Sequence, residues 1–243
     1  MKIYIIIPLL ALLINPANAD SLYFSNLENA TIDAELLEKT EKKRQEHQET
    51  KPTKFPPFHQ PNKPAVKIER FCTLCHNELA HRKNVAVRSF LNAHSRFISC
   101  ETCHFLPKKV PLIYRWLQND DSIENEENSL LQPHPAAHLS PFSQGMPVVL
   151  LPEHPFFQKV KTEWKNLPRS EQIQLTAKIH APLKEKGIYC KSCHDAEQKM
   201  LELDRIGASK KQQQAIEQNK IARLLDKAED KPTTLIHLID LLN

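Results

Sequence analysis

The chain has 243 residues, of which 40% are hydrophobic, and it contains 18 prolines but only 3 glycines. Lysine and arginine (33) nearly balance aspartate and glutamate (29), so the formal net charge is only +4. This composition indicates one or two domains with a thin side-chain core, and the charge gives no basis for predicting a nucleic-acid or anionic-membrane partner.

The N-terminal segment is typical of an export signal. A short positive start, Met1-Lys2, precedes the apolar stretch Ile3–Ile14, and Ala17-Asn18-Ala19 matches a small-residue cleavage pattern. These features predict a signal peptide over residues 1–19 and a mature chain that begins at Asp20. No later segment has the length that a transmembrane helix requires. We therefore expect an exported protein with no stable membrane span after cleavage, with an uncleaved anchor as the alternative.

Residues 20–67 are predicted to form a charged arm and a linker. Ala34–Glu49 is highly charged with helical spacing and few apolar residues, which indicates an exposed helix or a disordered segment. Lys51–Pro64 contains five prolines and is typical of a linker.

All six cysteines lie in three Cys-x-x-Cys-His units, at residues 72–76, 100–104 and 190–194. This pattern is typical of covalently attached c-type haem. Two thiols at this spacing form thioethers to the haem vinyl groups, and the following histidine reaches the iron. The predicted attachment residues are Cys72, Cys75, Cys100, Cys103, Cys190 and Cys193, and the predicted proximal iron ligands are His76, His104 and His194.

Two other interpretations of the cysteines remain open. The first two pairs have the spacing of a four-cysteine zinc site, and an exported chain can also use Cys-x-x-Cys for dithiol or disulfide chemistry. Neither explains why a histidine follows every second cysteine.

Between residues 71 and 195 the chain resembles the small multihaem, here trihaem, c-type cytochromes of bacterial respiratory chains. The resemblance implies a periplasmic location, electron transfer, and irons mostly bound by two histidines. The long gap between the second and third motifs departs from the most compact members and argues against one continuous stack of haems. Loss of Lys2 would lower the charge to +3, and the propionates of three haems would bring it to about −3, which again argues against a nucleic-acid partner.

The remaining elements are predicted to be mainly helical. We expect a haem-organised, loop-rich α fold with little or no β-structure, divided into a trihaem domain at 68–195 and a helical extension at 196–243. Asp120–Asn128 is an expected acidic loop and Gln132–Pro155 an expected irregular segment. The expected helices are Glu78–Asn92, Ser170–Lys186, Asp195–Arg205, Ser209–Ala228 and Thr233–Leu242.

Nine further histidines compete for the distal position on each iron. The preferred candidates are His94, His81, His138 and His180. His81 is too close to His76 to reach the same iron, so we expect it to serve a neighbouring haem. His94 is expected to cap the second haem or the first, and His180 stands in a similar relation to the third motif. Weaker candidates are His134, His154, His47, His59, His237 and, as the alternative ligand type, Met146 and Met200.

Three functions follow from these features. We expect an electron carrier, with no catalytic residues, between a quinol-oxidising membrane cytochrome and a terminal reductase or other acceptor. The first alternative is a haem enzyme in which one iron keeps an open position for a small nitrogen or sulfur compound. The second is a structural or docking subunit of a larger redox assembly.

Overall fold

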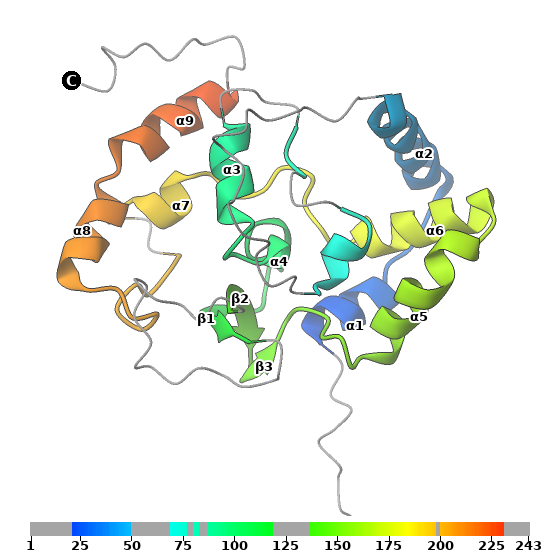
Figure 1. Ribbon diagram of the computed structural model, residues 1–243, viewed down its shortest axis with the longest axis horizontal. Helices are drawn as coiled ribbons and strands as arrows, with labels where there is room; N and C mark the ends of the chain where they lie inside the picture. Colours follow the sequence, from blue (N-terminus) through cyan, green and yellow to red (C-terminus); the bar gives the residue numbers. More distant parts are fainter. Residues whose placement is uncertain are drawn as a thin grey trace, which may run out of the picture.

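The computed structural model describes residues 21–49, 69–76, 80–82, 87–118, 137–197 and 200–230. The expected signal peptide, proline-rich linker, acidic loop and last helix therefore lie outside the described residues. Within them the chain is mainly helical with one small antiparallel sheet, which confirms the fold class at that level (Figure 1). The elements are α1 (Leu22–Glu28), α2 (Ala34–Glu49), η3 (Phe71–Leu74), α3 (Arg88–His94), α4 (Cys100–His104), β1 (Ile113–Leu117), β2 (His138–Ser143), β3 (Met146–Pro147), α5 (Pro155–Glu163), η4 (Trp164–Asn166), α6 (Arg169–His180), α7 (Lys191–His194), α8 (Lys210–Glu217) and α9 (Lys220–Asp230).

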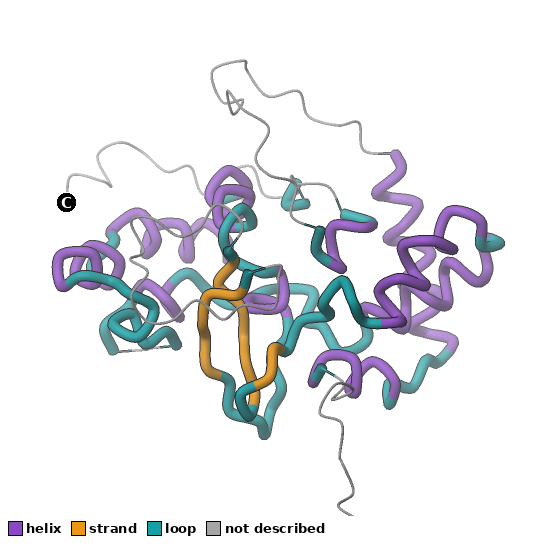
Figure 2. The backbone as a smooth tube through the Cα atoms, turned by 60° about the horizontal axis from the view of Figure 1, so that its bottom comes forward, coloured by secondary structure: helices purple, strands orange, loops and turns teal. Residues whose placement is uncertain are grey.

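These elements form two helical groups on either side of a small centre. Figures 1 and 2 show the sheet and α4 in the middle, with α1, α2, α5 and α6 toward one end and α7, α8 and α9 toward the other. The second motif forms α4 in this centre, whereas the third motif includes α7 in one of the helical groups.

Two strands of the sheet, β2 and β3, lie in the segment Gln132–Pro155, where irregular backbone was expected. β1 pairs antiparallel with β2, from Ile113 opposite Phe142 to Leu117 opposite His138, and β2 pairs with β3. Gln144 (φ +51°) and Gly145 (φ +82°) connect β2 to β3, and positive φ at both residues of a two-residue loop is the backbone of a tight hairpin turn. The sequence analysis did not predict β2 and β3 because they contain Pro141 and Pro147, and proline is rare inside sheets.

Several predicted helices have different limits in the structure. Residues 80–82 are not helical and the helix expected at Glu78–Asn92 begins only at Arg88, as α3. The helix expected to reach Lys186 ends as α6 at His180, because Pro182 has no backbone N–H with which to continue the helical hydrogen bonds.

The prediction of a helix at Asp195–Arg205 was wrong, since the described residues of this segment form turns and bends. Leu201 and Leu203 are instead buried with Ile206 against Trp116, whose indole Nε1 donates to the Ile206 carbonyl at 3.0 Å. The next predicted helix is divided into α8 and α9. Tertiary burial of these leucines has overridden the local helical preference.

The segment expected to be an arm contributes α1 to the core. Tyr23 and Leu27 are fully buried with Phe71, Phe105 and Phe157 in one hydrophobic cluster. The Tyr23 ring meets Phe105 edge-on at 5.9 Å, and its hydroxyl donates to the Ile179 carbonyl at 2.7 Å. α1 therefore joins the first motif, the second motif and α6.

The charged segment Ala34–Glu49 forms α2 over the expected range and packs on α6. Surface ion pairs join it to that region: Lys43 to Glu185 at 2.6 Å and Glu41 to Arg169 at 3.4 Å. Exposed pairs of this kind contribute little stability, so the packing of α2 rests mainly on its other contacts.

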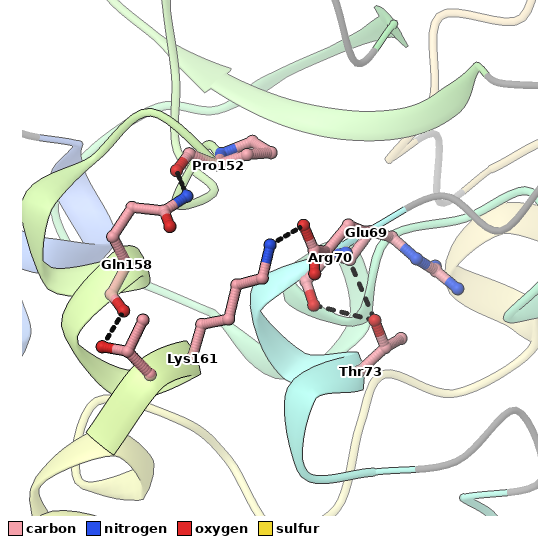
Figure 3. A network of polar contacts seen from close by, with 7 residues as sticks. Glu69, Arg70, Thr73, Pro152, Gln158 and Lys161 are labelled. Carbon is pink, nitrogen blue, oxygen red and sulfur yellow. Dashed lines mark hydrogen bonds and ion pairs between the residues drawn. The ribbon is translucent and has the colours of Figure 1, made fainter. Parts of the chain in front are cut away.

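The residues just before the first motif are held against α5 (Figure 3). Lys161 of α5 binds the carboxylate of Glu69 at 2.7 Å. The Arg70 backbone N–H donates to the Thr73 hydroxyl at 3.2 Å, and that hydroxyl donates back to the Arg70 carbonyl at 2.8 Å. These contacts fix the direction in which the chain enters Cys72.

The part of the chain that the structure describes contains no helix of the length and apolar character needed to cross a bilayer.

Shortening one side chain of α1 tests whether this helix is part of the core. Leu27→Ala should lower the free energy of unfolding by about 3 kcal/mol, because it removes a fully buried side chain and leaves a cavity. Glu28→Ala, at the exposed neighbouring position, should change it by less than about 0.5 kcal/mol. Denaturant titration of the purified protein measures both, and equal effects would show that α1 is not part of the core.

Candidate functional site

Each of the three motif histidines lies opposite a second histidine from elsewhere in the chain. The first pair is His76, which follows η3, and His180, the last residue of α6, with ring centres 5.8 Å apart and ring planes at 74°. His180 reaches this position because α6 packs beside α1 and α2. The sequence analysis placed His180 near the third motif, from which it is separated by ten positions, and the structure places it at the first.

The second pair is His104, at the end of α4, and His81, with ring centres 6.2 Å apart and planes inclined by 17°. His81 thus lies beside a neighbouring motif. This agrees with the expectation that it is too close to His76 in the sequence to share the same iron. Buried Asn92 holds it in place: the His81 backbone N–H donates to Asn92 Oδ1 at 3.0 Å, and Asn92 Nδ2 donates to the His81 carbonyl at 2.9 Å.

The third pair is His194, at the end of α7, and His94, at the end of α3, with ring centres 6.1 Å apart and planes at 87°. His94 was expected at the second or first motif. That expectation was wrong, because a single extended stretch to Cys100 was considered, whereas tertiary packing turns the end of α3 toward α7.

These three separations match the spacing of two imidazoles on opposite sides of one metal ion. A metal–imidazole bond is about 2 Å long and each ring centre lies about 1 Å beyond the bonded nitrogen, so the two ring centres lie about 6 Å apart. Within the described residues, no three or more His, Cys, Asp or Glu side chains are gathered around a common metal position. A haem iron needs only two protein ligands, because the porphyrin supplies the others. The donor set therefore fits haem.

Hydrogen bonds select the nitrogen that each ring offers to a metal. Nδ1 lies 2.8 Å from a carbonyl oxygen in His94 (Phe90), His104 (Lys184) and His180 (Thr176), and 3.0 Å in His194 (Ile216). In His81 it lies 3.3 Å from the amide oxygen Oδ1 of Asn92. Because these oxygens only accept, Nδ1 carries the proton and Nε2 keeps its lone pair.

Burial keeps three of these rings in the neutral form. It is the largest cause that lowers the pKa of His81, His180 and His194 below the usual histidine value. Neutral imidazole is the form that binds a metal, so these rings need no deprotonation at neutral pH.

None of the six cysteines is joined to another in a disulfide bond. Burial raises the pKa of Cys103 to about 11 and that of Cys193 to about 12, so both are protonated at neutral pH. The thiols of the first two motifs are also not gathered as a four-cysteine zinc site.

The second motif lies between the first and the third. Cys72 Sγ donates to the carboxyl of Glu101 in the second motif at 3.4 Å. On the other side, the Ile188 N–H donates to the Cys103 carbonyl at 3.2 Å and the Lys184 N–H to the His104 carbonyl at 2.7 Å. The segment that enters the third motif therefore lies directly on α4, despite the long gap in sequence.

The C-terminal helices α8 and α9 pack against the third motif. The Asp226 carboxylate of α9 accepts from the Cys190 and Lys191 backbone N–H groups, at 2.6 and 2.9 Å. α8 provides the Ile216 carbonyl that orients His194. The sequence analysis did not predict roles for Asp226, Asn92 or the buried Glu101. Of these, only Glu101 could have been noticed from the sequence, because it is a charged residue inside a motif.

Other candidate ligands are placed elsewhere. His138 is buried in β2 and belongs to none of the three pairs. His154 caps α5, where its Nδ1 accepts the Phe156 N–H at 3.1 Å, the opposite role from the Nδ1 atoms in the pairs. Met146 is exposed at the hairpin and Met200 packs beside the Leu201 cluster. His59, His134 and His237 lie outside the described residues, and the side chain of His47 is not described.

Asp226 offers a test of how the third motif is held. Asp226→Ala should lower the free energy of unfolding by about 2 kcal/mol, because two backbone N–H groups lose a charged acceptor. Asp226→Asn should have a smaller effect, since one oxygen remains, and Arg223→Ala, exposed on the same helix, should have almost none. Hydrogen exchange at residues 190–191 should accelerate in Asp226→Ala; unchanged exchange would contradict the assignment.

No protein-family model matches the chain, and comparisons with curated proteins and with solved structures likewise found no match. The function must therefore be inferred from the residues of the site itself.

Proposed function

We propose that the protein is an exported electron carrier with three covalently attached c-type haems, each iron bound by two histidines. The observation that carries this proposal is the set of three histidine pairs, 5.8, 6.2 and 6.1 Å between ring centres, each containing one histidine of a Cys-x-x-Cys-His motif. Three separate motifs with the same arrangement make a coincidence of packing a poor explanation.

The residues have distinct roles in this proposal. The six motif cysteines form the thioethers. His76 and His180 bind the first iron, His104 and His81 the second, and His194 and His94 the third. Backbone carbonyls beside four of these rings, and the Asn92 amide oxygen beside His81, hold the proton on Nδ1 and fix the ring orientation. Second-shell groups do the same at metal sites generally.

A carrier is favoured over an enzyme because every motif histidine faces a second imidazole. An iron bound by a porphyrin and two imidazoles has no position for a substrate, whereas it can gain and lose one electron. Two imidazoles also favour the oxidised state more than a histidine–methionine pair does, so we expect negative midpoint potentials. The proposed partners are a quinol-oxidising membrane cytochrome and a terminal reductase or other acceptor, and the export signal in the sequence favours the periplasm.

Neither alternative function has an observation of its own in the described residues. An open iron would require a motif histidine without an opposite ligand, and none of the three is arranged in that way. A docking subunit could use the charged helix α2 or the C-terminal helices α8 and α9, but α2 packs on α6, and α8 and α9 pack on α7.

The composition of the purified protein tests the proposal. Its intact mass should equal that of the chain beginning at Asp20 plus three haems, and electron paramagnetic resonance of the oxidised protein should show low-spin iron only. A high-spin signal from one iron, with stoichiometric carbon monoxide binding after reduction, would instead support the enzyme. A mass without covalent haem would refute the proposal.

The pairing makes a second, sharper prediction. His81→Ala, His94→Ala and His180→Ala should each convert one of three irons to high spin and open it to carbon monoxide, whereas His138→Ala and Met146→Ala should leave all three low-spin. The double variant Cys190→Ala/Cys193→Ala removes the third attachment site and should therefore lack the third haem. In that background His94→Ala should not change the spin state of the remaining irons, while His81→Ala should still open one iron. An added high-spin signal from His94→Ala in that chain would contradict the pairing.

A further inference from the structure

Two arginines beside the first motif each have a buried nitrogen atom that lacks a partner. Arg44 Nη1 and Arg70 Nε are the two buried side-chain nitrogen or oxygen atoms that make no hydrogen bond within the described part of the chain. Burying a charged donor without an acceptor is costly, and native proteins rarely leave one so. Both atoms therefore call for an acceptor.

Arg44 is held rigidly, but by uncharged groups. Its guanidinium lies over the Trp164 ring, 5.8 Å from the ring centre, and its Nη2 donates to Gln172 Oε1. Gln172 is itself fixed, because its Nε2 donates to the Trp164 carbonyl at 2.9 Å and to the Leu167 carbonyl at 3.1 Å. Both partners that the described residues give Arg44 are neutral, so they do not balance its charge.

Arg44 also lies at the first motif. α2 packs on α6, whose last residue, His180, faces His76. The charge of Arg44 acts on the Cys75 thiol, whose pKa burial raises and the guanidinium partly lowers. Lys43, its neighbour, is already paired with Glu185 at 2.6 Å. Arg44 differs from Lys43 in having a buried nitrogen atom, Nη1, that makes no hydrogen bond.

Arg70 differs because acidic and polar groups surround it. Its Nη1 donates to the Ile98 carbonyl at 3.5 Å, and its charge acts on the buried Glu101 carboxyl. A protein carboxyl is therefore available to balance Arg70, whereas none is in contact with Arg44 among the described residues.

We propose that Arg44 binds a propionate carboxylate of the haem attached at Cys72 and Cys75. This inference rests on the proposed function. A carboxylate accepts two parallel N–H bonds from a guanidinium. Among the described residues, Arg44 has an Nη1 without a hydrogen-bond partner and no acidic side chain in contact with its charge. α2 then serves as a strap that closes the first haem site, rather than as an arm for another protein.

The proposed ion pair should affect the potential of one haem only. A fixed cation beside a haem stabilises the added electron, so Arg44→Met should lower one of the three midpoint potentials and leave the other two unchanged. Arg44→Lys keeps the charge and should retain the potential, but it cannot reproduce the forked contact. Arg169→Met is the matched control, because Arg169 pairs with Glu41 at 3.4 Å across the same α2–α6 contact but is exposed; it should move no potential.

The experiment combines spectroelectrochemical titration of the holoprotein with resonance Raman detection of the propionate bending bands. A lowered potential and a shifted propionate band in Arg44→Met, both absent in Arg169→Met, would support the pair. Three haems with unchanged potentials and bands in Arg44→Met would overturn it. If Arg44→Met does not fold, Arg44→Lys provides the test. An unshifted propionate band in Arg44→Lys would also overturn the proposed ion pair. Wild-type protein without covalent haem would instead overturn the proposed function.

Discussion

The position of each motif histidine opposite a second imidazole from a distant segment is the constraint on which the rest of the structure depends. α6 brings His180 to His76, and α3 brings His94 to His194. A third segment then orients two of the rings through a backbone carbonyl: Lys184 does so for His104 and Ile216 for His194. On the proposed function each pair would bind one iron, and a metal bond tolerates little error in length or direction. The packing of α3, α6, α7 and α8 would then have to be accurate for all three pairs together.

The hydrophobic core is arranged around the same sites. It is divided into three clusters rather than one: the largest surrounds the first motif with aromatic side chains from α1, η3 and α5, and the second surrounds Trp116 and reaches Cys193 of the third motif. A chain with few apolar residues cannot fill one large interior. On the proposed function, the porphyrins would complete these clusters, which explains how so thin a side-chain core suffices.

The secondary structure was predictable where local preference and burial agree. The charged helix α2 has the limits expected from its sequence, because no tertiary contact opposes its helical spacing. The predictions were wrong where tertiary contacts decide. Leu201 and Leu203 are drawn to Trp116 out of the expected helix, and Pro141 lies inside a strand that its own residue type disfavours. Local patterns carry no information on such distant partners.

For the site, the sequence by itself predicted the chemistry that we propose: the three Cys-x-x-Cys-His motifs give the predicted attachment cysteines and proximal histidines, since such a motif is confined to five consecutive residues. It also included His81, His94 and His180 among the distal candidates. Only the tertiary structure decided which motif each one faces, and it overturned the expected positions of His94 and His180. The physical reason is that a distal ligand approaches from the opposite side of the metal, so its partner is set by helix packing and not by separation along the chain.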